Sequence, residues 1–343
     1  MLPARLDAGG FNRHTFLCGQ SGSGKTYSLG VMLERLLIET QLRIVIIDPN
    51  SDYVRLPAVR ADSDPVLAER YRAVVDRVAI RRAASTGAQP LRIRASELGS
   101  ACRAALLELD PVADREEYAV LSELLERDER GRPLIADIGE LLTSELPGAR
   151  GAGGSLPQIL AERDWRCLVV DLGSLDTPEE QAIVAESVLG TLWRLRRERE
   201  PVLIVIDEAH NVCPQRPDNP VTALATRHAV QIAAEGRKFG LSLLVSTQRP
   251  QKVHKNVLSQ CDNLVLMRMN SAADLAHLAT NFSFVPEGLL RHAGRFGLGE
   301  ALVAGRISPD PALVRFGARI TEEGGADVAT GWAQHAGDGS HEG

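Results

Sequence analysis

The chain alternates between short, continuous apolar runs and segments whose apolar residues recur at helical spacing. A helix is predicted after Thr26, where Leu29, Leu33 and Leu36 share one face. Buried strands are predicted at "HTFLCG" (14–19), "RIVIIDP" (43–49), "CLVVDL" (167–172), "VLIVIDE" (202–208), "LSLLVSTQ" (241–248) and "NLVLMRM" (263–269). Strands that alternate with helices predict an α/β fold with a mostly parallel sheet, covered by helices on both faces.

A stretch of different character interrupts this alternation. Helical patterns such as "PVLAERYRAVVDRVAIRRAAS" and "DREEYAVLSELLERDERG" dominate it, with one short strand predicted at "LRIRA" and a Gly-rich link, "GARGAGGS", near its end. We therefore predict an α/β core at residues 1–53 and 166–320, a mostly helical insertion at 54–165, and a flexible C-terminal tail at 321–343. Within the core, Thr177, Pro178 and Glu180 predict a helix that begins with a capping box.

Composition narrows the class of protein. The chain has 343 residues, of which 44% are hydrophobic and 24% charged, as in ordinary globular proteins. It has no apolar run near the ~20 residues of a membrane-spanning helix, no apolar segment typical of a signal peptide, and five cysteines without a CxxC pair. These features predict a cytoplasmic protein without membrane contact, disulfides or a zinc site. The net charge of -6 predicts that any nucleic acid binds at a local patch.

The segment "GQSGSGKT" (19–26) matches G-x-x-x-x-G-K-[ST], the pattern of a loop that binds nucleotide phosphates. Small residues let backbone N–H groups point at phosphate oxygens, the lysine contacts the β/γ-phosphates, and the hydroxyl takes one position on Mg²⁺. A flexible turn is the alternative, but the predicted strand before the segment and helix after it favour ATP binding. The residues expected to bind ATP are Gly19, Ser21, Gly22, Ser23, Gly24, Lys25, Thr26 and Tyr27.

Two adjacent acids end the predicted strand "VLIVIDE". Asp207 is expected to hold Mg²⁺ together with Thr26, and Glu208 to orient or deprotonate the attacking water. The second acid favours a hydrolase, because a phosphotransferase has to exclude water. The alternative is an acid pair that only caps a strand. Asp48 and Asp52, in "DPNSDY", are expected near the same edge of the sheet.

Gln248 ends a later predicted strand and is expected to contact the γ-phosphate or the attacking water; the alternative is a loop glutamine that bonds to the backbone. Arg237, in "EGRKFG", could reach a neighbouring subunit's nucleotide as a trans-acting finger, with Lys238 and Arg13 as further candidates. A cation favoured by a helix C-terminus is the alternative. Candidates for contacts with DNA phosphates, unless they are simply solvated, are Arg216, Lys252, His254 and Lys255.

Together these segments resemble the ATPase core of the HerA–FtsK superfamily, and most closely its HerA-like branch of DNA-translocating motors. The resemblance rests on "FNRHTFLCGQSGSGKT", "IIDPNSDY", "VVDLGSLDTPEEQ", "LIVIDEAHNVCP", "EGRKFGLSLLVSTQRP", "LSQCDNLVLMRM" and "GEALVAGRI", in that order, and covers most of residues 11–310. It implies a RecA-like ASCE P-loop core that forms a homohexameric ring around double-stranded DNA. It also implies Lys25 and Thr26 as ligands of phosphate and Mg²⁺, Gln248 as the sensor and Arg237 as a subunit-bridging arginine.

Two departures from the family pattern bear on function. Longer HerA-like proteins carry a β-barrel that docks nuclease partners ahead of the ATPase, whereas the first core strand starts by about His14 here, so a nuclease partner stays open. The "DPNSDY" segment has Asp52 where the family usually has glutamate. The favoured function is an ATP-driven translocase or helicase on double-stranded DNA, in DNA processing or defence. The alternative is an ATP-dependent assembly platform or switch that gates an effector such as a nuclease.

Overall fold

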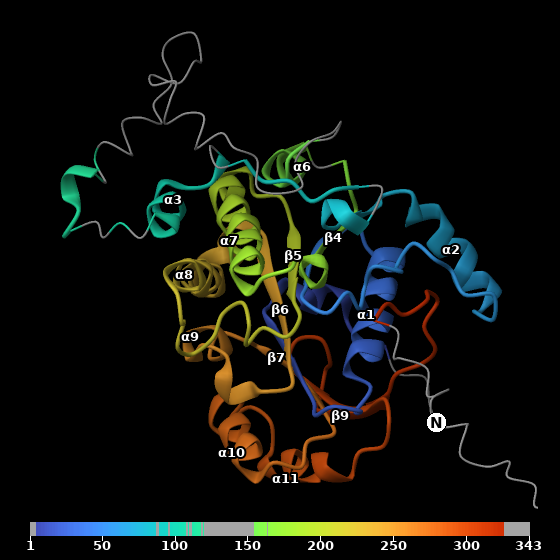
Figure 1. Cartoon of the computed structure of the whole chain (residues 1–343). Helices are drawn as coiled ribbons and strands as arrows, with labels where there is room; N and C mark the ends of the chain where they lie inside the picture. Colours follow the sequence, from blue (N-terminus) through green and yellow to red (C-terminus); the bar gives the residue numbers. More distant parts are fainter. Residues whose placement is uncertain are drawn as a thin grey trace, which may run out of the picture.

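A computed structural model describes residues 5–86, 89–94, 97–107, 109, 112–117, 119, 154–162 and 164–325. In this part of the chain, nine strands form one sheet in the order β3-β4-β2-β5-β6-β1-β7-β8-β9 (Figure 1). Their bounds are β1 Thr15–Cys18, β2 Arg43–Asp48, β3 Val78–Arg81, β4 Cys167–Asp171, β5 Val202–Ile206, β6 Leu241–Thr247, β7 Asn263–Met267, β8 Glu300–Ala304 and β9 Ala312–Arg315.

The strands from β3 to β7 in this order all run parallel, and β8 and β9 are added antiparallel at one edge. β6 lies between β5 and β1, so the segments that follow these three strands emerge side by side at the carboxyl edge of the sheet. The predicted α/β fold with a mostly parallel sheet is confirmed.

Helices cover both faces of the sheet, as predicted (Figure 1). Side chains alternate along β2: Ile44 and Ile46 pack in the apolar cluster that contains α1 and α2, whereas Val45 and Ile47 pack in the cluster that contains α7 and α8. Because both faces are covered, the central strands are mostly apolar, and β5 is apolar throughout. The helix bounds are α1 Lys25–Glu39, α2 Pro65–Val75, α3 Ser100–Leu106, α6 Leu156–Glu162, α7 Pro178–Leu195, α8 Pro220–Glu235, α9 Lys255–Leu258, α10 Ala272–Asn281 and α11 Glu287–Arg291.

Part of the predicted helical insertion belongs to the main sheet. The segment "PVLAERYRAVVDRVAIRRAAS" forms α2 and then strand β3, so its prediction as helix throughout is wrong, and "LRIRA" forms no regular strand in its described residues. β3 is stabilised by parallel pairing with β4, which places Val78 and Ile80 against the α1 cluster and Ala79 against the other. Most of "DREEYAVLSELLERDERG" and of the Gly-rich link lies outside the described residues, and the boundaries at 54 and 165 stay a prediction.

Local signals at helix starts behave as the sequence predicts. At the start of α7 the Thr177 side chain accepts a hydrogen bond from the Glu180 backbone N–H, and the Glu180 side chain accepts one from the Thr177 backbone N–H. This reciprocal capping box, with Pro178 at the first helical position, confirms the predicted start. None of the described helices combines the length and apolar character that crossing a bilayer requires.

The segment after β9 crosses α1 and is fixed there by a buried carboxylate. Glu34, which is fully buried, accepts hydrogen bonds from the backbone N–H groups of Ile320 (2.8 Å) and Thr321 (2.9 Å). It also pairs with the buried guanidinium of Arg319 at 3.4 Å. Further along, the backbone N–H of Gly324 donates to the Asp52 carbonyl, so the first residues of the predicted tail pack on the core. Residues 326–343 lie outside the described residues.

Replacing Glu34 by alanine should lower the free energy of unfolding by about 3 kcal/mol, because Arg319 would lose its buried partner and two buried N–H groups their acceptor. Urea unfolding followed by circular dichroism measures the change. Glu39→Ala is the matched control, since Glu39 lies on the same helix but pairs with Arg70 at the surface, where a pair contributes about 0–1 kcal/mol. Equal losses in both variants would contradict this account.

Candidate nucleotide-binding site

The loop between β1 and α1 needs glycine at several positions. Gly22 and Gly24 have φ angles of +70° and +87°, in the left-handed region that favours glycine. A Cβ on Gly19 would lie 2.7 Å from Ser23 Oγ and 2.8 Å from Met267 Cβ, so no larger residue fits without a backbone shift. Lys25 begins α1 directly after Gly24, so the loop lies over the N-terminus of a 15-residue helix. Such a loop provides N–H groups and a helix dipole for an anion.

This loop is bound to the end of β7. The Gln20 backbone N–H donates to the Arg268 carbonyl (2.8 Å), and the Gln20 side chain accepts from the Asn270 N–H (3.0 Å). The Arg268 guanidinium in turn donates to the Gly22 carbonyl at 2.7 Å. Sequence reasoning missed Arg268, because its contact is to a backbone carbonyl and the residue type carries no signal of it.

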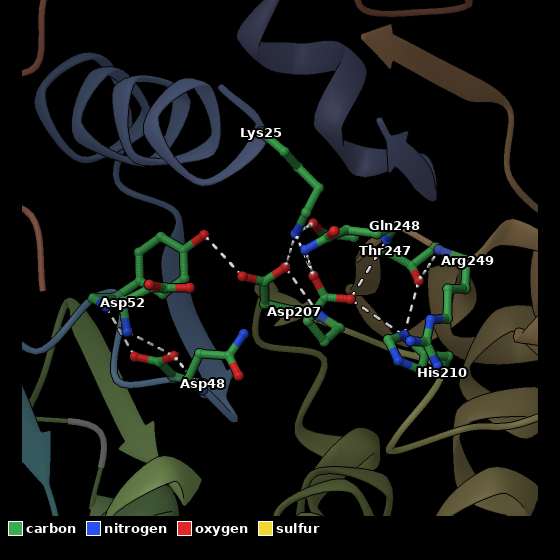
Figure 2. A network of polar contacts seen from close by, with 12 residues as sticks. Lys25, Asp48, Asp52, Asp207, His210, Thr247, Gln248 and Arg249 are labelled. Atoms are coloured by element: carbon green, nitrogen blue, oxygen red, sulfur yellow. Dashed lines mark hydrogen bonds and ion pairs between the residues drawn. The ribbon is translucent and has the colours of Figure 1, made fainter. Parts of the chain in front are cut away.

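The ammonium group of Lys25 is buried between two carboxylates (Figure 2). Its Nζ lies 2.7 Å from Asp207 Oδ1, 3.1 Å from Glu208 Oε1 and 3.0 Å from Ser246 Oγ. Burial alone would lower the pKa of Lys25, but the charges of Asp207 and Glu208 outweigh it and raise the pKa above the usual value. Lys25 therefore stays charged at the carboxyl edge of the sheet.

Asp207 is fully buried and bonded at both oxygens (Figure 2). Besides Lys25, its Oδ1 accepts from the Glu208 backbone N–H at 2.9 Å, and its Oδ2 accepts from the Tyr53 hydroxyl at 3.2 Å. Tyr53 follows β2 and was not predicted as a site residue. Burial, and then the negative charge of Asp207, raise the pKa of Tyr53 well above its ordinary value, so its hydroxyl remains a donor.

The Glu208 backbone has φ +40°, which is rare for a residue with a side chain and indicates strain at this position. Its carboxylate accepts from the Gln248 side-chain amide (2.9 Å) and lies 3.2 Å from His210 Nδ1. Burial would raise the pKa of Glu208, but hydrogen bonds from His210, Lys25 and Gln248 lower it to about 2. The predicted residues Lys25, Asp207, Glu208 and Gln248 thus come together, and His210 is an unpredicted fifth member.

Asp48 and Asp52 build the neighbouring turn (Figure 2). The Asp48 carboxylate accepts backbone N–H groups from Asn50 (3.3 Å), Asp52 (3.0 Å) and Tyr53 (2.8 Å), and so orients Tyr53. Burial raises the pKa of Asp48 to about 7. Burial and then the negative charge of Asp207 raise the pKa of Asp52 to about 6. Two carboxylates, Asp207 and Glu208, face the single ammonium group of Lys25, which favours an added cation.

These residues fit ATP and Mg²⁺. The glycine-lined loop excludes side chains where phosphates would lie, and the buried Ser23 hydroxyl has no hydrogen-bond partner in the structure. Thr26 follows Lys25 in the first turn of α1. Within the described ranges, no group of three or more His, Cys, Asp or Glu residues could hold a metal by itself. Mg²⁺ usually takes one or two protein ligands together with phosphate and water oxygens, a role that Thr26 and Asp207 could fill.

The arginine and lysine residues that the sequence singled out lie at two opposite edges of the sheet. Arg237 and Arg13 both face Asp262, at 2.7 and 3.7 Å, just before the starts of β6, β1 and β7. They therefore lie at the amino edge of the sheet, away from the chain's own phosphate loop.

The predicted DNA-contact residues lie at the carboxyl edge. Pro214 and Val253 form an isolated bridge, and the Gln215 backbone N–H donates to the Lys252 carbonyl at 2.7 Å. The Gln215 side chain accepts from the Lys255 N–H at 2.8 Å. The structure thus brings Arg216, Lys252 and Lys255, all exposed, onto two adjoining loops.

Replacing Gly19 by alanine should weaken binding of a fluorescent ATP analogue at least tenfold, because the added methyl group would displace Ser23 and with it the phosphate loop. Titration of the analogue followed by fluorescence anisotropy measures the dissociation constant. Gly288→Ala is the control, since a Cβ there meets nothing within 4 Å. Unchanged affinity in Gly19→Ala would show that the loop does not bind phosphate as described.

The family model and the relatives that this chain matches are all described as HerA. The family model described as "Helicase HerA, central domain" matches residues 1–144. The DNA double-strand break repair helicase HerA of Pyrococcus furiosus is 24% identical, over 89% of this chain and 65% of its own length. The corresponding protein of Saccharolobus solfataricus is 24% identical over 92% of this chain and 66% of its own length. That of Sulfurisphaera tokodaii is 33% identical over 43% of this chain and 30% of its own length.

The chain spans less than two thirds of the length of each of these relatives. Among solved structures, VirB4 of Thermoanaerobacter pseudethanolicus superposes with a TM-score of 0.56 at 18% identity, covering 89% of both chains, which shows a shared P-loop fold of the RecA-like type. The family model, the relatives and the strand, loop and acid pair described above agree. The resemblance of this chain to the HerA-like branch of the HerA–FtsK superfamily of P-loop ATPases is confirmed.

Proposed function

We propose that this chain hydrolyses ATP and uses the energy to move on, or unwind, double-stranded DNA as one subunit of a ring. The observation that carries the hydrolytic part is the position of Glu208, buried beside the Lys25 ammonium and within hydrogen-bond distance of Gln248. A second acid at this position suits an enzyme that activates water. The names of the relatives, DNA double-strand break repair helicases, support DNA as the track.

Each site residue has a distinct task in this proposal. Backbone N–H groups of Gly19 to Thr26 bind the ATP phosphates, Lys25 exchanges its carboxylate partners for the β/γ-phosphates, and Tyr27 lies beside the nucleotide. Thr26 and Asp207 would hold Mg²⁺, which neutralises charge on the phosphates. Glu208 accepts a proton from the attacking water, and Gln248 positions that water.

The DNA-contact part of the proposal rests on local charge. The whole chain carries a net charge of -6, yet Arg216, Lys252 and Lys255 gather on adjoining loops that begin where β5 and β6 end. Such a patch suits contacts with the phosphate backbone, which carry no sequence information. All five cysteines are free and buried, which fits work in the reducing cytoplasm as part of the proposal.

We expect ATP turnover of the purified protein to rise in the presence of duplex DNA and the stimulation to fade as salt increases, because phosphate contacts release counterions. Glu208→Gln should lower turnover by ~10²-fold or more with or without DNA, since the amide cannot accept the proton of water. Phosphate release across a salt series measures both effects. Turnover that depends on Glu208 but ignores DNA would favour the alternative, an ATP-dependent platform that gates a partner effector.

Ring assembly predicts a role in trans for Arg237. Because Arg237 lies at the sheet edge opposite its own phosphate loop, it can reach only a neighbour's nucleotide, and Arg237→Ala should lower turnover by ~10³-fold. Lys238→Ala, on the adjacent residue, should change little. Mixing Arg237→Ala with Glu208→Gln subunits should restore part of the turnover, because some interfaces then combine an intact Glu208 with an intact Arg237. A mixture as inactive as its components would argue against a shared site.

A further inference from the structure

Both oxygens of the Glu208 carboxylate are occupied by protein donors. Oε1 lies 3.1 Å from Lys25 Nζ and accepts from Gln248 Nε2 at 2.9 Å. Oε2 lies 3.2 Å from His210 Nδ1 and 3.4 Å from the Gln248 backbone nitrogen. Only 7% of the side chain is exposed. A water molecule can therefore reach either oxygen only after one of that oxygen's own donors leaves, and the donors of the other oxygen still hold the carboxylate in place.

Phosphate binding accounts for the departure of one donor but not of the others. Lys25 is the residue that binds nucleotide phosphates in the proposed function, so ATP binding itself removes Lys25 from Oε1. His210 lies on the opposite side of the carboxylate, where it contacts Oε2. Its release thus needs a second event.

The tautomer of His210 follows from its two neighbours. Nδ1 is 3.2 Å from Glu208 Oε2 and 3.0 Å from Thr247 Oγ1. A bare Nδ1 would place a lone pair against a carboxylate, so the proton belongs on Nδ1, which then donates to Glu208. The Thr247 hydroxyl lies within hydrogen-bond distance of the same nitrogen and helps fix the ring.

Thr247 connects this histidine to the loop that carries the DNA-contact candidates. Its Oγ1 also accepts from the Arg249 backbone N–H at 3.0 Å. The Lys252 N–H donates to the Arg249 carbonyl at 3.0 Å, and the Lys252 carbonyl accepts from Gln215. A displacement of this loop would therefore change the position of Thr247 Oγ1 and of the histidine that it supports.

We propose that His210 and Thr247 are positioning residues that hold Glu208 in an arrested position, and that DNA phosphates bound to the 249–255 loop release it. The inference rests on the proposed function, in which Glu208 activates water and Lys252 and Lys255 contact DNA. The positive φ of Glu208 fits a carboxylate held away from its relaxed conformation. The arrangement would keep ATP turnover low until the ring has bound double-stranded DNA.

The test compares ATP turnover with and without duplex DNA in His210→Ala and Thr247→Val. Turnover without DNA should rise about tenfold in each, as expected when a hydrogen bond to a charged group is lost. Stimulation by DNA should shrink by the same factor, with KM for ATP unchanged. His210→Asn should restore the low DNA-free turnover, because its side-chain amide places an N–H donor at the position of Nδ1. His292→Ala, at an exposed histidine outside the network, is the control.

Several outcomes separate this inference from the proposed function. The double variant His210→Ala/Glu208→Gln should be inactive, which would show that the gained turnover passes through Glu208. If His210→Ala lowers turnover equally with and without DNA, the histidine only supports the site and the inference is overturned. If wild-type turnover ignores DNA, the DNA part of the proposed function fails and with it the coupling, whereas raised turnover in His210→Ala would still support the arrested position.

Discussion

The site depends on one buried ammonium group placed between two carboxylates where parallel strands end. Any one of these charges buried alone would cost several kcal/mol, so each needs the others. Lys25 and Asp207 are 182 residues apart in sequence and meet at 2.7 Å, because β6 lies between β1 and β5 and adds Ser246 as a further ligand of the ammonium. The sheet order and the glycine-lined loop are both required for this contact. In the proposed function, nucleotide binding would exchange these protein carboxylates for phosphates around the same lysine.

The parts of the fold that could be predicted are those whose signals are local or repeated. β5 is apolar throughout, and β2 is apolar between Arg43 and Asp48, because both faces of the sheet are covered. The capping box of α7 lies within four residues. β3 could not be predicted, since its four residues are only half-buried and continue the pattern of α2; pairing with β4, almost ninety residues later, makes it a strand.

The same distinction applies to the site. The phosphate loop and the acid pair have fixed spacings, so Lys25, Asp207 and Glu208 were predicted. Tyr53 and Arg268 form hydrogen bonds with partners that lie 154 and 246 residues away in the sequence. The residues next to them in the sequence carry no signal of those partners. His210 is only two residues from Glu208, but its contact depends on the positive φ of a glutamate, which no residue type encodes.

β6 explains how the nucleotide site could respond to the loop that follows this strand. The last two residues of β6 and the residue after them contact three parts of the site: Ser246 contacts Lys25, Thr247 contacts His210, and Gln248 contacts Glu208. Neighbouring residues in a strand point to opposite faces, so a register shift of one position would exchange these contacts. A displacement of the 249–255 loop would therefore act on the same end of β6. Lys25 and Glu208, to which we assign phosphate binding and water activation, thus both contact the end of this strand, although they come from different elements.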